Sequence, residues 1–372
     1  MPLGTYNQVR PWAKSVREQV ARRKMPPWFA DPHYGKFAND PTLSLTDIDT
    51  IAKWVDGGAV PGKPQDSPQP RVWLENWAIG QPDAIFQMPK PFQVPANEDI
   101  DYQYMIVPTG FKEDRWVTKV QLRPGNRSVV HHAVVYVREP GSTWLKGMPV
   151  GPPFTLPGGT TSDILFTYTP GNSRDEWPDG MAKLIPAGSD LVFQMHYTSA
   201  KKPTFDQSRI GIIFAKTTPA QRVLTLQLND FRLFIPPGRP DYQVTVSGTL
   251  PDQARLLSLY PHMHLRGKQF EYAIYKAGQR QTLLKVHNYD FYWQLTYRLA
   301  DPPMLPAGTR MECIAVFDNS RNNPRNPDPE AFVRYGQKST DEMMIGFFDV
   351  AVPADTDKFR YFENRRKPPS MR

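Results

Sequence analysis

Proline places the strongest limit on the fold of this chain, which holds 40 prolines and 24 glycines in 372 residues. A proline interrupts a helix and is excluded from the middle of a sheet, so long regular elements are disfavoured over most of the sequence. The prolines and glycines are spread in turn-like strings such as Pro-Gly-Asn and Leu-Pro-Ala-Gly, with alternating apolar segments between them. This pattern predicts a mainly β protein built from many short strands.

Two short helices are expected near the N-terminus. Apolar residues recur at steps of three and four from Tyr6 to Val20, with Pro11 in the first turn or at a kink. A second helix is expected over about 47–55, where Thr46 can cap its start and Gly57-Gly58 can end it. Helices this short do not hold a core by themselves.

Changes of pattern along the chain divide it into five parts. We assign 1–62 to the helical segment, 63–80 to a proline-rich linker, 81–225 and 226–360 to two β-blocks, and 361–372 to a tail. Each β-block has turn signals roughly every ten residues, as β-sandwiches do. The expected fold is therefore mainly β, with two tandem antiparallel β-sandwich (jelly-roll-like) domains after a short α-helical segment.

Charge and cysteine content exclude several classes of protein. The net charge is +8, but Lys and Arg are dispersed and form no basic run with interleaved aromatics. A solvated basic surface is therefore favoured over a nucleic-acid-binding surface. Cys313 is the single cysteine, so an intrachain disulfide and a thiolate zinc site are excluded. Its strand-like surroundings predict that it is buried and packs as a small apolar residue. No apolar stretch reaches the length of a membrane span, and no signal peptide opens the chain.

The histidines indicate a metal protein. Five of the seven fall into three clusters within strand-like sequence, Val-Val-His131-His132-Ala-Val-Val, Phe-Gln194-Met-His196-Tyr and Tyr-Pro-His262-Met-His264. Imidazole is the commonest protein ligand for copper, zinc, iron and nickel, which makes such grouping typical of a metal site. The other two, His33 in a loop and His287 without a partner nearby in the sequence, are not counted as ligands.

The period of a β-strand predicts how these clusters are arranged. Side chains two residues apart share a face, so His262 and His264 can reach one ion, and Gln194 lies on the same face as His196. Adjacent residues face opposite sides, so His131 and His132 can meet one ion only at a bulge or a strand end. The Arg-Pro-Gly-Asn-Arg stretch just upstream is a suitable place for such an irregularity.

The number of ligands predicts which metal is bound. A site made of His131, His132 and His196 leaves the second site with two histidines and one donor missing. The chain has 13 methionines and a single cysteine, so a thioether is the available soft donor. A mixture of histidine and methionine selects copper, above all Cu(I).

Four motifs, in order, give the chain a family resemblance over about 85–355. They are Val-Val-His131-His132, Leu-Val-Phe-Gln194-Met-His196-Tyr, His262-Met-His264-Leu-Arg-Gly-Lys268 and Ser339-Thr-Asp341-Glu342-Met343. The sequence resembles the type II, ascorbate-dependent copper monooxygenases, the family of peptidylglycine alpha-hydroxylating monooxygenase and dopamine beta-monooxygenase. Each motif is weak by itself, but four in the family's order are specific.

The resemblance implies two coppers per chain with different tasks. The copper of His131, His132 and His196 would store an electron. The catalytic copper would be held by His262, His264 and Met343, with Met344 as the nearest competitor for the third position. Gln194 and Tyr260 would lie beside the cofactor, where Gln194 would belong to a water path or to the surroundings of the ligands.

The implied partners are a small-molecule substrate, O2 and an electron donor, ascorbate-like or a cytochrome. One oxygen atom would enter a C–H bond and the other would leave as water. The resemblance also implies a periplasmic or secreted location.

Three departures from the family bear on the substrate. Tyr260 stands where the peptide-hydroxylating members carry a substrate-binding Arg, and Ile345 and Phe347 replace an Asn and a Tyr. The pocket beside the second copper is therefore expected to be apolar, without an anion clamp. We expect that the substrate is not a peptide ending in glycine.

Residues 1–62 resemble the second half of a cytochrome c domain. The resemblance rests on Met25-Pro-Pro-Trp, where Met25 matches the axial methionine, and on Leu-Thr-Asp-Ile-Asp-Thr-Ile-Ala-Lys-Trp54-Val-Asp-Gly-Gly. No cysteine precedes residue 313, so the heme-attaching Cys-x-x-Cys-His is missing. Heme c is expected only if the native chain extends upstream of Met1; a degenerate remnant is the alternative.

Two other functions are open from the sequence. A copper-binding or electron-transfer protein without hydroxylase activity would use the first site but would not need an open second one. A sandwich without metal, such as a carbohydrate-binding module, would use the nine tryptophans and 16 tyrosines as stacking platforms.

Overall fold

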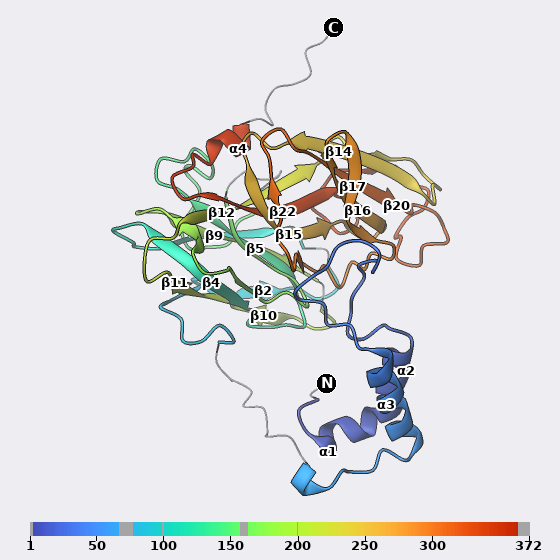
Figure 1. The fold of residues 1–372 in the computed structure, drawn as a ribbon. Coiled ribbons are helices and arrows are strands. Elements are labelled where there is room, and N and C mark those ends of the chain that lie inside the picture. The colour runs from blue at the N-terminus through green and yellow to red at the C-terminus, as the bar shows by residue number, and fades with distance from the viewer. Residues whose placement is uncertain (1–2, 67–76, 99, 157–162, 199, 364–372) are drawn as a thin grey trace. The chain divides into compact units, whose positions relative to one another are not determined.

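A computed structural model describes residues 3–66, 77–98, 100–156, 163–198 and 200–363. The chain forms two compact units, Met1–Phe29 with Asn39–Asn76, and Ala30–Ala38 with Trp77–Arg372. Strands dominate the second unit, and the first is helical (Figure 1). The expected fold class, mainly β after a short helical segment, is confirmed. Segment 30–38, expected within the helical part, instead belongs to the β unit.

The helical unit consists of short elements. They are α1 (Tyr6–Val9), the 3₁₀ turn η1 (Arg10–Trp12), α2 (Ala13–Ala21), α3 (Leu45–Asp56) and η2 (Pro64–Asp66). Pro11 lies in η1, at the break between α1 and α2, as its fixed φ and missing N–H predict. The expected linker, 63–80, includes residues 67–76, which lie outside the described residues.

The cap predicted for α3 was wrong by two residues. Ser44 precedes the helix, and its side chain accepts a hydrogen bond from the backbone N–H of Asp47. The Asp47 carboxylate in turn accepts the Ser44 N–H at 3.1 Å. Thr46 also has a carboxylate three residues later, at Asp49, but the reciprocal bonds of a capping box form between Ser44 and Asp47, so the helix begins two residues earlier than predicted. Gly57 follows the helix, as expected.

A ten-stranded sheet runs through the whole β unit. Its order is β1 (Ala84–Gln87), β11 (Arg209–Phe214), β4 (Arg115–Arg123), β8 (Met181–Ile185), β12 (Gln221–Asn229), β22 (Ile345–Pro353), β15 (Ala254–His262) and β18 (Tyr297–Arg298), with β7 (Arg174–Glu176) on β4 and β19 (Met304–Leu305) on β15. Figure 1 shows β4 and β11 in one half of this sheet and β22 and β15 in the other.

Two four-stranded sheets complete the two halves. One has the order β3 (Gln103–Pro108), β9 (Asp190–Tyr197), β5 (Val130–Arg138), β6 (Asp163–Tyr168), and the other β14 (Tyr242–Thr249), β20 (Arg310–Phe317), β16 (Gly267–Lys276), β17 (Gln279–Val286). Two small pairs, β2 (Phe92–Val94) with β10 (Thr204–Asp206) and β13 (Phe234–Ile235) with β21 (Val333–Arg334), and helix α4 (Phe359–Glu363) are the remaining elements. The expected tail, 361–372, begins inside α4, and 364–372 lie outside the described residues.

One parallel pairing joins the two halves. Strand β12 pairs with β8 in parallel, Gln221 with Met181 and Arg222 with Ala182, whereas the other pairings between described strands are antiparallel. The expected boundary between the β-blocks, after residue 225, falls inside β12. Val223, Leu257 and Ala351 from the second half belong to the core cluster of the first. The two halves are therefore parts of one unit.

The first sandwich has its core between β4, β8 and β11 on one side and β3, β5, β6 and β9 on the other. Buried side chains from both sheets, such as Val120, Ile210, Val135 and Phe193, belong to one apolar cluster. Strand β5 is buried on both of its faces, with Val134 and Tyr136 in a second cluster on the outer face. The sequence of a strand that is buried on both faces is a nearly continuous run of apolar residues.

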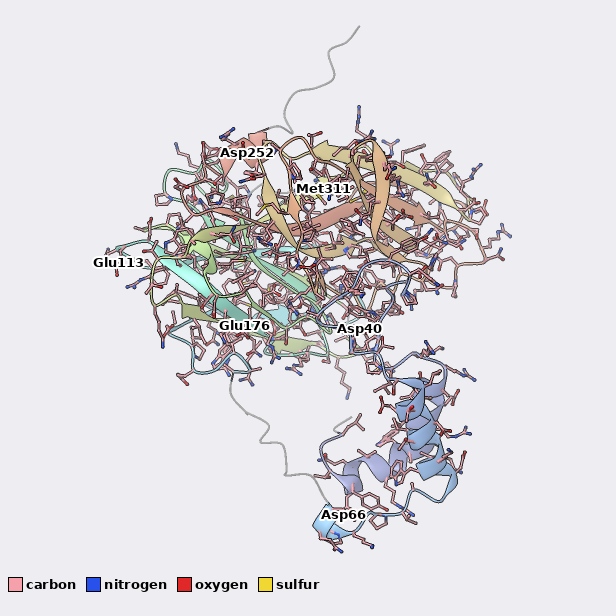
Figure 2. All side chains as sticks on the ribbon, viewed as in Figure 1. Asp40, Asp66, Glu113, Glu176, Asp252 and Met311 are labelled. Carbon is pink, nitrogen blue, oxygen red and sulfur yellow. The ribbon has the colours of Figure 1, made fainter. Side chains whose placement is uncertain are left out.

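The second sandwich packs β22 closely onto β16 and β20. A Cβ placed on Gly346 would lie 2.5 Å from Cys313 Sγ and 3.1 Å from the ring of Tyr272. Cys313 is fully buried, which confirms the buried position predicted from the sequence. Met311 of β20 is also buried, whereas Glu113 lies on the exposed rim of the first sandwich (Figure 2).

Segment 30–38 lies along the second sandwich. The Asp31 N–H donates to the Lys285 carbonyl at 2.8 Å. The Asp31 carboxylate accepts the backbone N–H of His33 at 2.9 Å and contacts His287 Nε2 and His33 Nδ1, both at 2.7 Å. These bonds, the backbone one first, hold the pKa of Asp31 well below its usual range. His287 therefore has a partner after all, from 256 residues away, where no sequence pattern could indicate it.

No helix among the described residues combines the length and the apolar character needed to cross a bilayer.

Gly346 sets how closely β22 can approach the opposite sheet. We expect Gly346→Ala to lower the free energy of unfolding by about 1–3 kcal/mol, because the added methyl group overpacks a site bounded by Cys313 and Tyr272. Denaturant unfolding measures the change. Gly248→Ala is the control, since its Cβ would meet only the flexible end of Leu228, and it should stay within about 0.5 kcal/mol of wild type. Equal losses in both variants would contradict this account.

Candidate metal centre

A bulge in β5 brings two adjacent histidines to one side of the sheet. Val130 pairs with Tyr197 and His132 pairs with His196, so His131 is an extra residue in β5. An extra residue breaks the alternation of side chains, which confirms the irregularity that the His-His pair required. The first histidine group, His131, His132 and His196, has ligand atoms that all lie within 4.8 Å of one another.

The Nδ1 atoms of this group converge. His132 Nδ1 lies 3.1 Å from His131 Nδ1 and 3.2 Å from His196 Nδ1. His131 Nε2 lies 3.2 Å from the Phe291 carbonyl, which can only accept, so its single proton is on Nε2 and its Nδ1 is a bare lone pair. At most one of the two Nδ1 contacts can then be a normal hydrogen bond. A cation placed among the three nitrogens would use all of these lone pairs.

Burial keeps these imidazoles neutral. The three side chains are each at most 4% exposed. Burial lowers the pKa of His131 to about 4, and burial together with the neighbouring imidazoles lowers the pKa values of His132 and His196 well below the usual range. A neutral imidazole is the form that binds a metal, so the site is prepared for an ion at neutral pH.

The second histidine group, His262 and His264, lies where β15 ends. His262 is the last residue of the strand, and His264 is in the turn that follows, with ring centroids 5.3 Å apart. His262 Nδ1 donates to Gln294 Oε1 at 2.6 Å, and His264 Nδ1 donates to the Asp341 carbonyl at 3.3 Å. Both bonds leave Nε2 as the unprotonated atom. His264 Nε2 is buried and has no partner within the described part of the chain.

Glu342 holds the turn that carries His264. Its carboxylate accepts the backbone N–H of His264 at 2.8 Å, of Arg266 at 2.6 Å and of Met343 at 3.2 Å. The side chain is fully buried, and burial raises the pKa of Glu342 to about 7 against the opposing effect of these bonds. One carboxylate therefore fixes the backbone on both sides of the second histidine group.

The two histidine groups touch. The rings of His132 and His262 are 5.5 Å apart in an edge-to-face contact, which leaves no room for a water layer. The Phe291 ring stacks on His131 at 4.1 Å and meets His264 edge-on at 6.3 Å. The sequence left the separation of the groups open; the structure places all five histidines in one buried cluster.

A pocket opens beside this cluster. Its lining includes His132, His262 and Met343, together with Gln194 and Tyr260, and it encloses about 570 Å³ of empty space, counted with its opening to solvent. Met343 and Met344 are both buried just before β22, and Met343 is the one that lines the pocket. Every residue expected beside the metals is therefore in the cluster or in the pocket wall.

Gln194 bonds to tyrosines instead of a histidine. It donates to the Tyr104 hydroxyl at 2.5 Å and accepts from the Tyr136 hydroxyl at 3.3 Å. Met195 and Tyr197, its neighbours on the other face of β9, belong to the core of the first sandwich. Gln194 thus organises the pocket wall.

Three residues at the cluster were missed in the sequence. They are Phe291, Gln294 and Ser339, whose hydroxyl lies 3.2 Å from His196 Nε2. All three come from loops, where no periodicity marks a position. Ser339 stands at the start of the fourth motif, which was a signal for its place near the metal ligands. The spacing of Phe291 and Gln294, three residues apart after a strand, is too common to be specific.

No family model matches this chain, and no curated protein matches it in sequence. Among solved structures, it is similar to a protein of infectious bursal disease virus, Gx strain, at 7% identity and a TM-score of 0.22, covering 74% of this chain and 73% of the other. It is also similar to the major capsid protein P2 of bacteriophage PM2, at 10% identity and a TM-score of 0.28, covering 71% and 98%. Similarities of this size identify no shared function.

The neutral histidines predict how the stability of the metal-free protein depends on pH. Unfolded histidines titrate near pH 6.5, whereas His131 and His262 titrate near 4 when folded. Between these values the unfolded chain binds more protons, so the free energy of unfolding should fall as the pH is lowered from 6.5 to 4. Denaturant unfolding of the metal-free protein across this range measures the slope. His131→Gln should flatten it, and His33→Gln, whose side chain is 83% exposed, should not. A slope unchanged in His131→Gln would contradict the prediction.

Glu342 should control one histidine group and not the other. In Glu342→Gln one oxygen is replaced by an NH₂ group, which cannot accept a backbone N–H, so the turn at His264 loosens. We expect metal binding by the second group to weaken about 10–100-fold, with the first group unchanged, in a titration against a competing chelator. Glu330→Gln, on the exposed side of the 318–332 loop, is the matched control. Equal weakening of both groups would mean that Glu342 supports only the fold.

Proposed function

We propose that this protein is a copper-dependent monooxygenase that hydroxylates a C–H bond of a small organic substrate, using O2 and an external reductant. One observation supports it above the others: five buried, neutral histidines form a single cluster, and two of them, His132 and His262, line a pocket. The family resemblance of the four motifs points the same way.

The donor set fits copper. The described donors are five imidazoles with a thioether beside them, and no thiolate or carboxylate belongs to the first histidine group. Hard cations such as magnesium and calcium need oxygen ligands, and a structural zinc site favours thiolates. Imidazole with thioether suits copper, and the thioether favours Cu(I). The buried Nε2 of His264, without a partner, marks one position where a bound ion would complete the site.

Each group would hold one copper, His131, His132 and His196 the first, and His262, His264 and Met343 the second. Bound copper would supply one-electron redox chemistry and a binding position for O2. The chain's own residues prepare the ligands. The Phe291 carbonyl fixes the tautomer of His131, and Gln294 fixes that of His262, so the lone pairs are on Nδ1 of His131 and on Nε2 of His262.

The histidine cluster would serve electron transfer, and the pocket would bind the substrate. The contact between His132 and His262 brings the two groups together without intervening solvent, which shortens any electron path between them. The pocket orients the substrate against His262 and Met343 on the side of the second group. The aromatic side chains in the wall limit the access of water to that side of the pocket. Side reactions of a reactive intermediate with water are thereby reduced.

Copper content and oxygen consumption test the proposal together. After dialysis against a weak chelator, about two coppers per chain should remain, and His131→Ala and Met343→Ile should each retain about one. Oxygen uptake with ascorbate as reductant should be abolished in both variants. His33→Ala, at an exposed position outside the cluster, should keep both coppers and full uptake.

The alternatives give different results in the same assay. Two coppers without substrate-dependent oxygen uptake would identify an electron-transfer protein. No copper after dialysis, and no effect of the histidine variants, would leave a sandwich without a metal.

A further inference from the structure

The pocket beside the histidine cluster has an unusual wall. Six aromatic side chains line it, Tyr102, Tyr136, Phe231, Tyr260, Tyr335 and Phe347. Its other polar residues are neutral, Thr167 and three glutamines, and no Asp, Glu, Lys or Arg belongs to the lining that the described residues provide. The two histidines in the wall, His132 and His262, are the residues assigned above to the metal groups.

Charged residues lie behind this wall, but they are paired. A smaller pocket shares Thr167, Tyr260 and Phe347 with the first and is lined on its far side by Asp175, Lys183 and Asp349. Lys183 donates to the Ile164 carbonyl at 2.7 Å and to the Thr225 hydroxyl at 2.6 Å, and that hydroxyl donates to Asp349. Asp175 forms an ion pair with Arg298. These groups already have partners, so they offer no counter-charge to a ligand in the aromatic pocket.

The aromatic rings form a flat-sided space. Tyr260 and Phe347, cross-strand neighbours in β15 and β22, stack with centroids 5.5 Å apart and planes 17° apart. At the open side, Phe231 is 53% exposed and meets Tyr335 edge-on at 5.1 Å. Flat aromatic surfaces favour a planar ring, which can stack on one wall and meet another with its edge.

Hydroxyl groups in the pocket wall can form further hydrogen bonds. The Tyr102 hydroxyl is buried and has no hydrogen-bond partner within the described part of the chain. The hydroxyls of Tyr136 and Tyr260 each make one long bond, of 3.3 Å, to a glutamine. A buried hydroxyl without a partner is costly, so a ligand that supplies one neutral donor or acceptor would be favoured.

We infer that the substrate is a small, uncharged molecule with a planar ring and a neutral oxygen function such as a hydroxyl group. That the ligand is a substrate rests on the proposed function, but the preference for a neutral molecule with a ring follows from the pocket alone. An ion would lose its hydration on entry and find no opposite charge in the wall. The absence of an anion clamp at Tyr260, predicted from the sequence, is one part of this neutrality.

Three probes of one shape and different charge test the inference: benzyl alcohol, benzylamine and benzoate. Ligand-observed NMR titration of the metal-free protein measures binding to the pocket without any contribution from a bound ion. We expect benzyl alcohol to bind at least about tenfold more tightly than either ion. Equal or tighter binding of benzylamine or benzoate to the metal-free protein would overturn the inference.

A charge added to the wall should change the preference. Gln227 lines the pocket and pairs with Phe347 across β12 and β22. Gln227→Glu should favour benzylamine over benzyl alcohol, because the new carboxylate supplies the missing counter-charge. Gln243→Glu, at an exposed position of β14 outside the pocket, is the matched control and should leave the order of the probes unchanged. An unchanged order in Gln227→Glu would mean that the probes bind elsewhere, and would overturn the inference.

Oxygen uptake by the copper-loaded protein separates this inference from the proposed function. Binding of benzyl alcohol to the metal-free protein without uptake in the loaded protein would contradict the oxygenase and leave the neutral pocket supported. Uptake that depends on benzylamine or benzoate, and not on benzyl alcohol, would support the oxygenase and overturn the neutral substrate.

Discussion

The pairing of β12 with β8 is the interaction on which the rest of the structure depends. It continues the sheet of the first sandwich into the second, so the outer face of β12, β22 and β15 lies against the outer face of β3, β9 and β5. The first histidine group comes from one of these faces and the second from the other. Neither sandwich by itself holds all five histidines, so the cluster depends on the two halves forming one compact unit.

The period of two along each strand distributes side chains between the core and the site. In β5, His132, Val134 and Tyr136 face the pocket, whereas Ala133 and Val135 fill the sandwich. This part of the site could be predicted from the sequence, because strand period and ligand spacing are local properties. The bulge at His131 could also be predicted. Two adjacent histidines can bind one ion only if an extra residue interrupts the alternation of the strand, and His131 is that extra residue in β5.

The remainder of the site could not be predicted, because it depends on loops and on contacts between distant parts. Phe291, Gln294 and Ser339 reach the histidines from segments without a period. The contact between His132 and His262 follows from the docking of two faces, which no local pattern specifies. The cap of α3 is a further example, because Ser44 and Thr46 each have an aspartate three residues later and the local pattern does not distinguish them.

The energetics of the cluster indicate that function, not folding, maintains it. Three Nδ1 atoms meet at 3.1 and 3.2 Å with too few protons to bond one another, and burial removes the water that would otherwise satisfy them. Each unsatisfied buried nitrogen costs about 1–3 kcal/mol. Apolar residues of similar size would relieve this cost in the folded chain. A bound cation relieves it too, because it accepts the lone pairs that the protein leaves exposed to one another. Retaining five such side chains in one buried place is therefore consistent with a site whose stability comes from its ligand.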